Sequence, residues 1–129
     1  MTRENVTSTD FVCPGSILKI KVDNSDPLAW GSENQSIIFF NRSLAFRTGV
    51  PSSVNIDRKV VASFHERGPH LLSGYLKGEV FLNRAAIIIR YDYHKGNVIV
   101  LGGRVQHRAQ TYATFKFLFN SIYYAAMPK

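Results

Sequence analysis

The sequence lacks several features that would place it in a familiar class of protein. Cys13 is the only cysteine among the 129 residues, so neither an intrachain disulfide nor a zinc site built from cysteines can form. No apolar stretch approaches the roughly 18 residues of a membrane-spanning helix. The N-terminus shows no apolar signal segment, and no glycine-rich nucleotide-binding pattern occurs. These absences argue against a disulfide-rich scaffold, a membrane span and a nucleotide site, and they leave the cellular compartment open.

Residues 65–70 resemble a helical zinc-binding motif, but their spacing does not allow the two histidines to bind one metal ion. In the HExxH motif, histidines at i and i+4 share one face of a helix, and the adjacent glutamate acts as a base. Here His70 comes five positions after His65, and Gly68 and Pro69 lie between them. Because no helix can present both imidazoles together, we predict no metal site and no cofactor in this chain.

Cys13 is also poorly placed to act as a nucleophile. Pro14 follows it directly and has no backbone N–H, so an oxyanion hole at that position would lack a donor. No neighbouring base can be assigned to activate the thiol. We therefore expect a buried, unreactive cysteine, which is how most free thiols behave in folded proteins.

Acidic residues are scarce beside the basic ones. The chain has 16 lysines and arginines against 9 aspartates and glutamates, which gives a formal net charge of +7. The cations are scattered along the chain rather than gathered in a run or on one helix face. The excess has two explanations, a polyanion such as nucleic acid as the partner or a merely solvated basic surface, and the scatter favours the second.

The residues that are present have the pattern of one globular domain. At 129 residues with 45% hydrophobic side chains, the chain is long enough to bury one core. Residues 1–11 are polar and predict a loose lead-in, whereas residues 12–129 predict a single domain. Apolar segments, alternating or continuous, predict five strands: residues 16–22, 37–40, 60–64, 85–91 and 97–101.

The last third of the chain indicates the fold class. A short glycine-containing link joins residues 85–91 to residues 97–101, which predicts an antiparallel hairpin. Gly102-Gly103 follows, and a helix is predicted over about residues 109–126. We therefore predict an α/β fold in which a mixed sheet of about five strands carries the C-terminal helix on one face.

The predicted helix is rich in aromatic residues. Its main apolar stripe, expected to face the sheet, consists of Phe115, Leu118, Phe119, Ile122 and Ala126. Phe117 and Tyr124 lie off this stripe. The additional aromatic residues have two explanations, a wide core-facing stripe or a second surface that contacts a partner or another domain. The wide stripe is the simpler of the two and is favoured here.

Arg104, Gln106, His107 and Arg108 form the candidate binding site. They follow a strand and the Gly102-Gly103 turn, close to the expected helix start, where open α/β sheets form ligand crevices. A helix N-terminus favours anions, and Arg108 would add a charge-assisted donor, so a small anionic ligand is predicted. The alternative is that the polar side chains only cap and solvate the turn. No second titratable group is placed to make His107 half of a catalytic pair.

Three passages together resemble one protein family. They are residues 11–31, with Cys13-Pro14-Gly15 and Trp30-Gly31; residues 72–79, with Ser73-Gly74-Tyr75; and residues 95–120, with Gln106-His107-Arg108-Ala109-Gln110. In order and spacing they are similar to the C-terminal region of large bacterial zinc-carboxypeptidase-like proteins. In that family a metallopeptidase domain precedes a class I glutamine-amidotransferase-like domain. The match runs from about Phe11 to Tyr124, nearly the whole chain.

The resemblance implies a domain without catalysis of its own. The zinc ligands and the catalytic glutamate would lie in a peptidase domain outside this sequence, so zinc is expected only there. His107 falls where a glutaminase keeps its catalytic histidine, but Arg108-Ala109 replaces the Pro-Glu of that motif and no elbow cysteine exists. The implied fold is the C-terminal half of a flavodoxin-like domain. The implied role is a non-catalytic accessory domain, in a family whose full-length members are exported.

Three functions remain open on the sequence. The favoured one is an accessory or interaction domain that packs against other domains or subunits, self-association included, and that holds a small anion near Arg104, His107 and Arg108. The second is a small basic module for nucleic acid or another polyanion, whose affinity would fall steeply with salt. The third is a stand-alone hydrolase that uses His107 with an unassigned partner.

Overall fold

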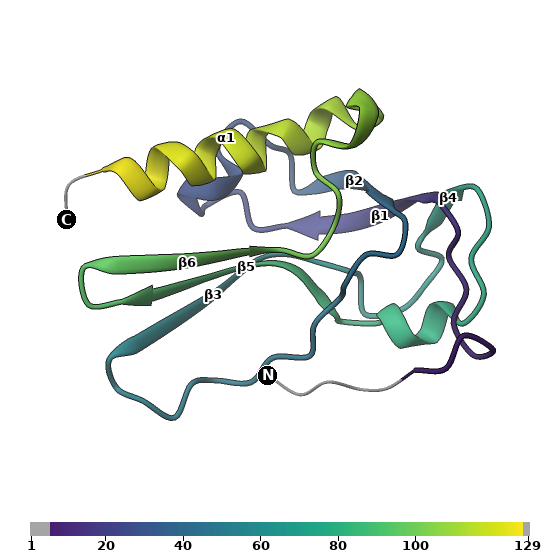
Figure 1. Cartoon of the computed structure of the whole chain (residues 1–129), viewed down its shortest axis with the longest axis horizontal. Helices are drawn as coiled ribbons and strands as arrows, with labels where there is room; N and C mark the ends of the chain where they lie inside the picture. Colours follow the sequence, from purple (N-terminus) through teal and green to yellow (C-terminus); the bar gives the residue numbers. More distant parts are fainter. Residues whose placement is uncertain (1–5, 128–129) are drawn as a thin grey trace.

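The computed structural model describes residues 6–127, which form one sheet with a single long helix on it (Figure 1). The strands are β1 (Ser16–Val22), β2 (Gln35–Phe40), β3 (Ile56–Ser63), β4 (Leu71–Ser73), β5 (Ala86–Tyr93) and β6 (Gly96–Leu101). Three short 3-10 turns, η1 (Pro27–Ala29), η2 (Glu79–Leu82) and η3 (His107–Ala109), precede the helix α1 (Tyr112–Ala126). Each of the five predicted strands lies on an observed one. The pattern does not predict β4, because so short a strand shows no period.

The strand order is β2-β1-β3-β5-β6, and β4 pairs with the first half of β1. Every pairing among the described strands is antiparallel, so the prediction of a mixed sheet is wrong. A parallel pair needs a long crossover connection, usually a helix, whereas the one long helix described here follows the last strand. The α/β class, the approximate number of strands and the helix on one face agree with the prediction.

The last two strands form the predicted hairpin. β5 and β6 pair from Ile88 opposite Leu101 to Tyr93 opposite Gly96. In the tight turn between them His94 has a φ of 51°, a left-handed conformation that short hairpin turns use. The first four residues of β5 are buried, so the start of β5 lies in the core, whereas β6 is the edge strand and is only partly buried.

Helix α1 covers one face of the sheet, but the side that it buries is not the predicted one. Thr114, Phe117 and Ser121 are buried, whereas Phe119 at the centre of the predicted stripe is 55% exposed. The small hydroxyl residues allow close approach because their polar groups are satisfied locally. Thr114 Oγ1 donates to the carbonyl of Val105 at 2.7 Å, and Ser121 Oγ donates to the carbonyl of Phe117 at 2.5 Å. The predicted stripe is therefore right only in part, because Leu118 packs against the core, whereas Phe119 and Ile122 face outward and Phe117, outside the predicted stripe, is fully buried.

The opposite face of the sheet is crossed by irregular chain. After β2, Phe46 exchanges two backbone hydrogen bonds with Ala86 at the start of β5. The next residues pass over the β3–β5 pair, where the carbonyl of Thr48 accepts a hydrogen bond from Arg58 at 2.9 Å. Arg58 and Lys59 are neighbours on β3, so their side chains leave the sheet on opposite faces. One face is thus covered by a helix and the other by a loop.

Candidate functional site

The predicted site residues lie in the loop between β6 and α1. Arg104, Gln106 and Arg108 are exposed, and His107 is half-buried. The His107 ring stacks on that of Phe39, with 5.0 Å between the ring centroids and 8° between the planes. The loop therefore packs the imidazole of His107 against β2 and leaves the other three side chains exposed.

The helix does not begin where the prediction placed it. Arg108 and Ala109 have φ values of 47° and 53°, which is the left-handed region that a right-handed helix cannot pass through. The helix α1 starts only at Tyr112, after the short turn η3. The predicted helix start at residue 109 is therefore wrong, and the candidate site does not lie on the first turn of α1. A ligand held by Arg104, Gln106, His107 and Arg108 stays a prediction.

The glycine pair before this loop is explained by packing. A Cβ on Gly102 would collide with the carbonyl oxygen of Leu44, and a Cβ on Gly103 would collide with the side chain of Ile38. Both glycines therefore permit β2 and the segment after it to lie against the end of β6. Close packing explains both glycines without a bound ligand.

The other candidates from the sequence are buried and hydrogen-bonded. The Cys13 thiol donates to the carbonyl of Phe40 at 3.3 Å, and burial raises the pKa of the Cys13 thiol, which disfavours the nucleophilic thiolate. The expectation of a buried cysteine is confirmed. His70 is fully buried, and its Nε2 lies 2.8 Å from Oδ1 of Asn83.

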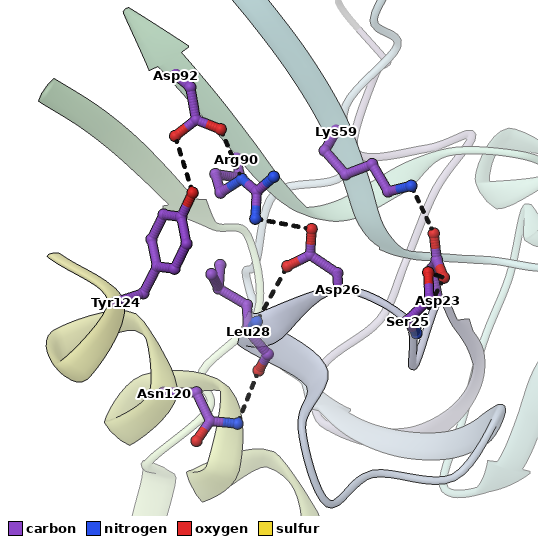
Figure 2. A network of polar contacts seen from close by, with 9 residues as sticks. All are labelled: Asp23, Ser25, Asp26, Leu28, Lys59, Arg90, Asp92, Asn120 and Tyr124. Carbon is purple, nitrogen blue, oxygen red and sulfur yellow. Dashed lines mark hydrogen bonds and ion pairs between the residues drawn. The ribbon is translucent and has the colours of Figure 1, made fainter. Parts of the chain in front are cut away.

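A polar network joins α1, the loop before β2 and the strands β3 and β5 (Figure 2). At its centre, Arg90 Nη1 lies 2.9 Å from Asp26 Oδ2, and Arg90 Nε lies 2.9 Å from Asp92 Oδ2. These contacts are ion pairs rather than well-aligned hydrogen bonds. The side chain of Asp26 is 1% exposed and that of Arg90 is 12% exposed, so water screens their attraction weakly. Tyr124 of α1 closes the network, because its hydroxyl donates to Asp92 at 3.3 Å and its ring centre lies 4.8 Å from the guanidinium of Arg90.

The acidic residues of the loop have different tasks. Asp26 Oδ1 accepts the backbone N–H of Leu28 at 3.0 Å and so caps the turn η1. Asp23 accepts the hydroxyl of Ser25 at 2.5 Å and pairs with Lys59 Nζ at 3.0 Å. Ser25 and then Lys59 hold the pKa of the Asp23 carboxyl below its usual range. Asp23 in turn raises the pKa of Lys59.

Two side chains of α1 fasten the helix to this loop. Asn120 Nδ2 donates to the carbonyls of Leu28 and Trp30, both at 3.0 Å. Lys116 Nζ donates to the carbonyl of Gly31. Together with the contact of Tyr124 to Asp92, these bonds fix the rotation of α1 about its axis and hence the side that faces water. Figure 2 shows the bond of Asn120 to Leu28 and that of Tyr124 to Asp92.

The outer side of α1 is an apolar surface. Its large exposed side chains, here named the α1 stripe, are Tyr112, Phe119, Ile122 and Tyr123. They recur at helical spacing and are 55–74% exposed. Lys116 is the one charged residue in α1. Trp30, which is 80% exposed, lies beside the helix because its carbonyl accepts a hydrogen bond from Asn120.

Sequence reasoning missed the polar network and the outward position of the α1 stripe. Asp26-Pro27 is a recognisable helix-start signal, with a capping side chain before proline at the first position. That signal could have placed Asp26 at a turn. No local pattern pairs Asp26 with Arg90, which is distant in the chain and reaches it only through the sheet.

Comparisons with known proteins give no relative from which to transfer a function. No model of a protein family, no curated protein and no solved structure matches the chain. Within residues 6–127, no three histidine, cysteine, aspartate or glutamate side chains gather as a metal-binding group. In the same residues, no helix combines the length and apolar character needed to cross a bilayer.

Proposed function

We propose that the chain is a non-catalytic interaction domain of a zinc-carboxypeptidase-like protein, and that it associates with a second copy through the α1 stripe. The observation that carries the proposal is the apolar outer side of α1. Tyr112, Phe119 and Tyr123 are each more than half exposed, although the same helix buries small polar residues. Contiguous apolar surface of this kind is characteristic of association sites.

A second copy fits the α1 stripe because this part of the surface is almost free of charge. The whole chain carries a formal net charge of +7, so two copies repel one another over most approaches. In α1 only Lys116 is charged, and its Nζ is turned to the carbonyl of Gly31. A two-fold arrangement would bring the two helices together and bury the same apolar residues from each copy.

The link to a peptidase-like protein rests on the resemblance of residues 11–31, 72–79 and 95–120. The antiparallel sheet differs from the parallel sheet of a doubly wound domain. The proposed relation therefore concerns the order of strand, glycine pair, polar loop and helix at the C-terminal end. The non-catalytic role is supported by the buried Cys13 thiol and by the stacking of His107 on Phe39.

The test is sedimentation velocity of the purified chain over a range of concentrations. The wild-type chain of 14.6 kDa is expected to reach twice that mass as concentration rises. Tyr123→Lys, which places a charge in the α1 stripe, is expected to stay monomeric. Tyr75→Lys is the matched control, because Tyr75 is 57% exposed on the loop after β4, and it should dimerise like the wild type.

Two results would contradict the proposal. A wild-type chain that remains monomeric, or a dimer that Tyr123→Lys and Tyr75→Lys weaken equally, would exclude association through the α1 stripe. Hydrolysis of peptides or of glutamine by the isolated chain would exclude a non-catalytic role.

A further inference from the structure

A second candidate site lies on the face of the sheet opposite α1. Here the loop after β2, the strand β3 and the start of β5 enclose a pocket of about 330 Å³. Its polar lining comprises Arg47, Thr48, Arg58, Ser63 and Arg84. Three of these five side chains carry a positive charge, and none of the lining residues is acidic. Nothing in the sequence pattern gathers these residues, because they come from three separate segments.

Arg58 lines this pocket, and one of its N–H donors has no partner. Its Nη1 donates to the carbonyl of Thr48 at 2.9 Å, which fixes the guanidinium under the loop. Its Nε is buried and has no hydrogen-bond partner within residues 6–127. In the same residues no carboxylate lies at ion-pair distance from Arg58. Arg58 is half-buried, and a buried guanidinium N–H without an acceptor is unfavourable. An anion held beside the guanidinium would offset part of this cost through its charge.

Arg47 and Arg84 also line the pocket. Arg47 Nη1 donates to the carbonyl of Asn83 at 2.6 Å, a contact that orients the guanidinium. Arg84 pairs with Glu66 at 3.1 Å, but both side chains are at least 70% exposed, so this pair is weak and readily exchanged. Three guanidinium groups therefore line the pocket, and no carboxylate is among its lining residues.

We propose that this pocket binds a small anion through a carboxylate or phosphate group, with Arg58 as the principal donor and Arg84 as a second. The guanidinium fork matches both oxyanions in a bidentate arrangement. The volume of about 330 Å³ lies at the lower end of small-molecule pockets, which fits a compact metabolite rather than a polymer. The site is independent of the α1 stripe, which lies on the other face, and of the loop that contains His107.

The test is an NMR titration of the arginine Nε–Hε signals with sodium phosphate, exchanged against sodium chloride at constant ionic strength. A parallel titration with sodium acetate separates recognition of phosphate from recognition of carboxylate. The signal of Arg58 is expected to shift and to saturate with at least one of the two anions. Arg58→Gln should weaken binding by about tenfold or more, because a charge-assisted bond is lost.

Two further variants keep the result interpretable. Arg84→Gln alters an exposed side chain with little risk to folding and should weaken binding by about two- to fivefold. Arg42→Gln removes the same charge from an exposed position outside the pocket and should leave the affinity unchanged. The proposal is overturned if neither anion gives a saturable shift at Arg58. It is also overturned if Arg58→Gln, with an unchanged circular dichroism spectrum, binds as well as Arg42→Gln.

Discussion

Two arginines on neighbouring strands divide the molecule into two different faces. On the face covered by α1, Arg90 lies 2.9 Å from two carboxylates, and one of them is almost wholly buried. On the opposite face, Arg58 pairs with no carboxylate among residues 6–127, and its buried Nε lacks a partner. Both side chains are cations held close to the sheet. They differ in whether the fold itself supplies the counter-charge.

The comparison separates a structural charge from one that is left for a ligand. Removing one member of a buried ion pair leaves the other charge uncompensated, so Arg90 and its partners are coupled to stability. Removing Arg58 leaves no buried carboxylate behind, so its loss should affect binding more than folding.

Among the side chains compared here, the buried side of α1 is expected to contribute most to the free energy of unfolding. Phe117 is fully buried against the sheet, whereas Phe119 is 55% exposed. Phe117→Ala should lower the free energy of unfolding by about 3–5 kcal/mol, and Phe119→Ala should change it by less than about 0.5 kcal/mol. Urea denaturation of both variants measures the difference. Equal losses would show that α1 does not pack as described.

The ion pairs beneath α1 should make the next largest contribution to the free energy of unfolding. Asp26→Ala removes a carboxylate that both pairs with Arg90 and caps the turn η1. The expected loss is about 3 kcal/mol, because Arg90 loses one of its two counter-charges. Asp57→Ala is the matched control on exposed surface, with a change below about 0.5 kcal/mol. A loss no larger than that of the control would mean that the network contributes nothing to stability.

Replacing each arginine by glutamine tests the comparison itself. Arg90→Gln should destabilise the chain by about 3 kcal/mol, since two carboxylates lose their cation. Arg58→Gln should change the free energy of unfolding by only about 1 kcal/mol, since it removes one hydrogen bond to the carbonyl of Thr48 and no ion pair. Both values come from urea denaturation in a buffer without phosphate or carboxylate. A larger loss for Arg58→Gln than for Arg90→Gln would reverse the assignment.

The smallest effect is a dependence on pH at the edge of the network. Ser25 and Lys59 hold the pKa of Asp23 below its usual value near 4 in the folded chain. The stabilisation from Asp23 is therefore present above about pH 4 and is lost as the pH falls through the folded pKa. Because Asp23 is 37% exposed, the effect should stay below about 1 kcal/mol.

The pH effect is read as the difference in stability between the wild type and Asp23→Asn. That difference should be present at neutral pH and should shrink as the solution is acidified below about pH 4. A difference that grows on acidification would contradict the direction assigned to the pKa of Asp23.

The sequence predicts most of the local structure but not the contacts that define the two faces. Alternation of apolar residues is enough to place β1 and the β5–β6 hairpin, because strand period and turn chemistry are local properties. The sheet is antiparallel throughout its described pairings because no helix connects its strands, and a hydrophobic pattern alone does not show this.

The candidate sites depend even more on contacts between distant segments, which a local sequence pattern does not predict. Hydrophobicity alone places Phe119 and Ile122 toward the sheet, although both are exposed. Thr114 and Ser121 are buried instead, because their hydroxyls bond to backbone carbonyls of the chain. The pocket around Arg58 and Arg84 depends on where a loop crosses the sheet. The spacing of the arginines along the chain does not predict this crossing.

The most direct test of the difference between the two faces is the effect of phosphate on stability. Urea unfolding of the wild type, Arg58→Gln and Arg90→Lys is compared in sodium phosphate and in sodium chloride at equal ionic strength. Because a ligand stabilises the folded state that binds it, phosphate should raise the free energy of unfolding of the wild type and of Arg90→Lys, and not of Arg58→Gln. An equal increase in all three proteins would contradict the account, as would an increase that survives in Arg58→Gln and is lost in Arg90→Lys.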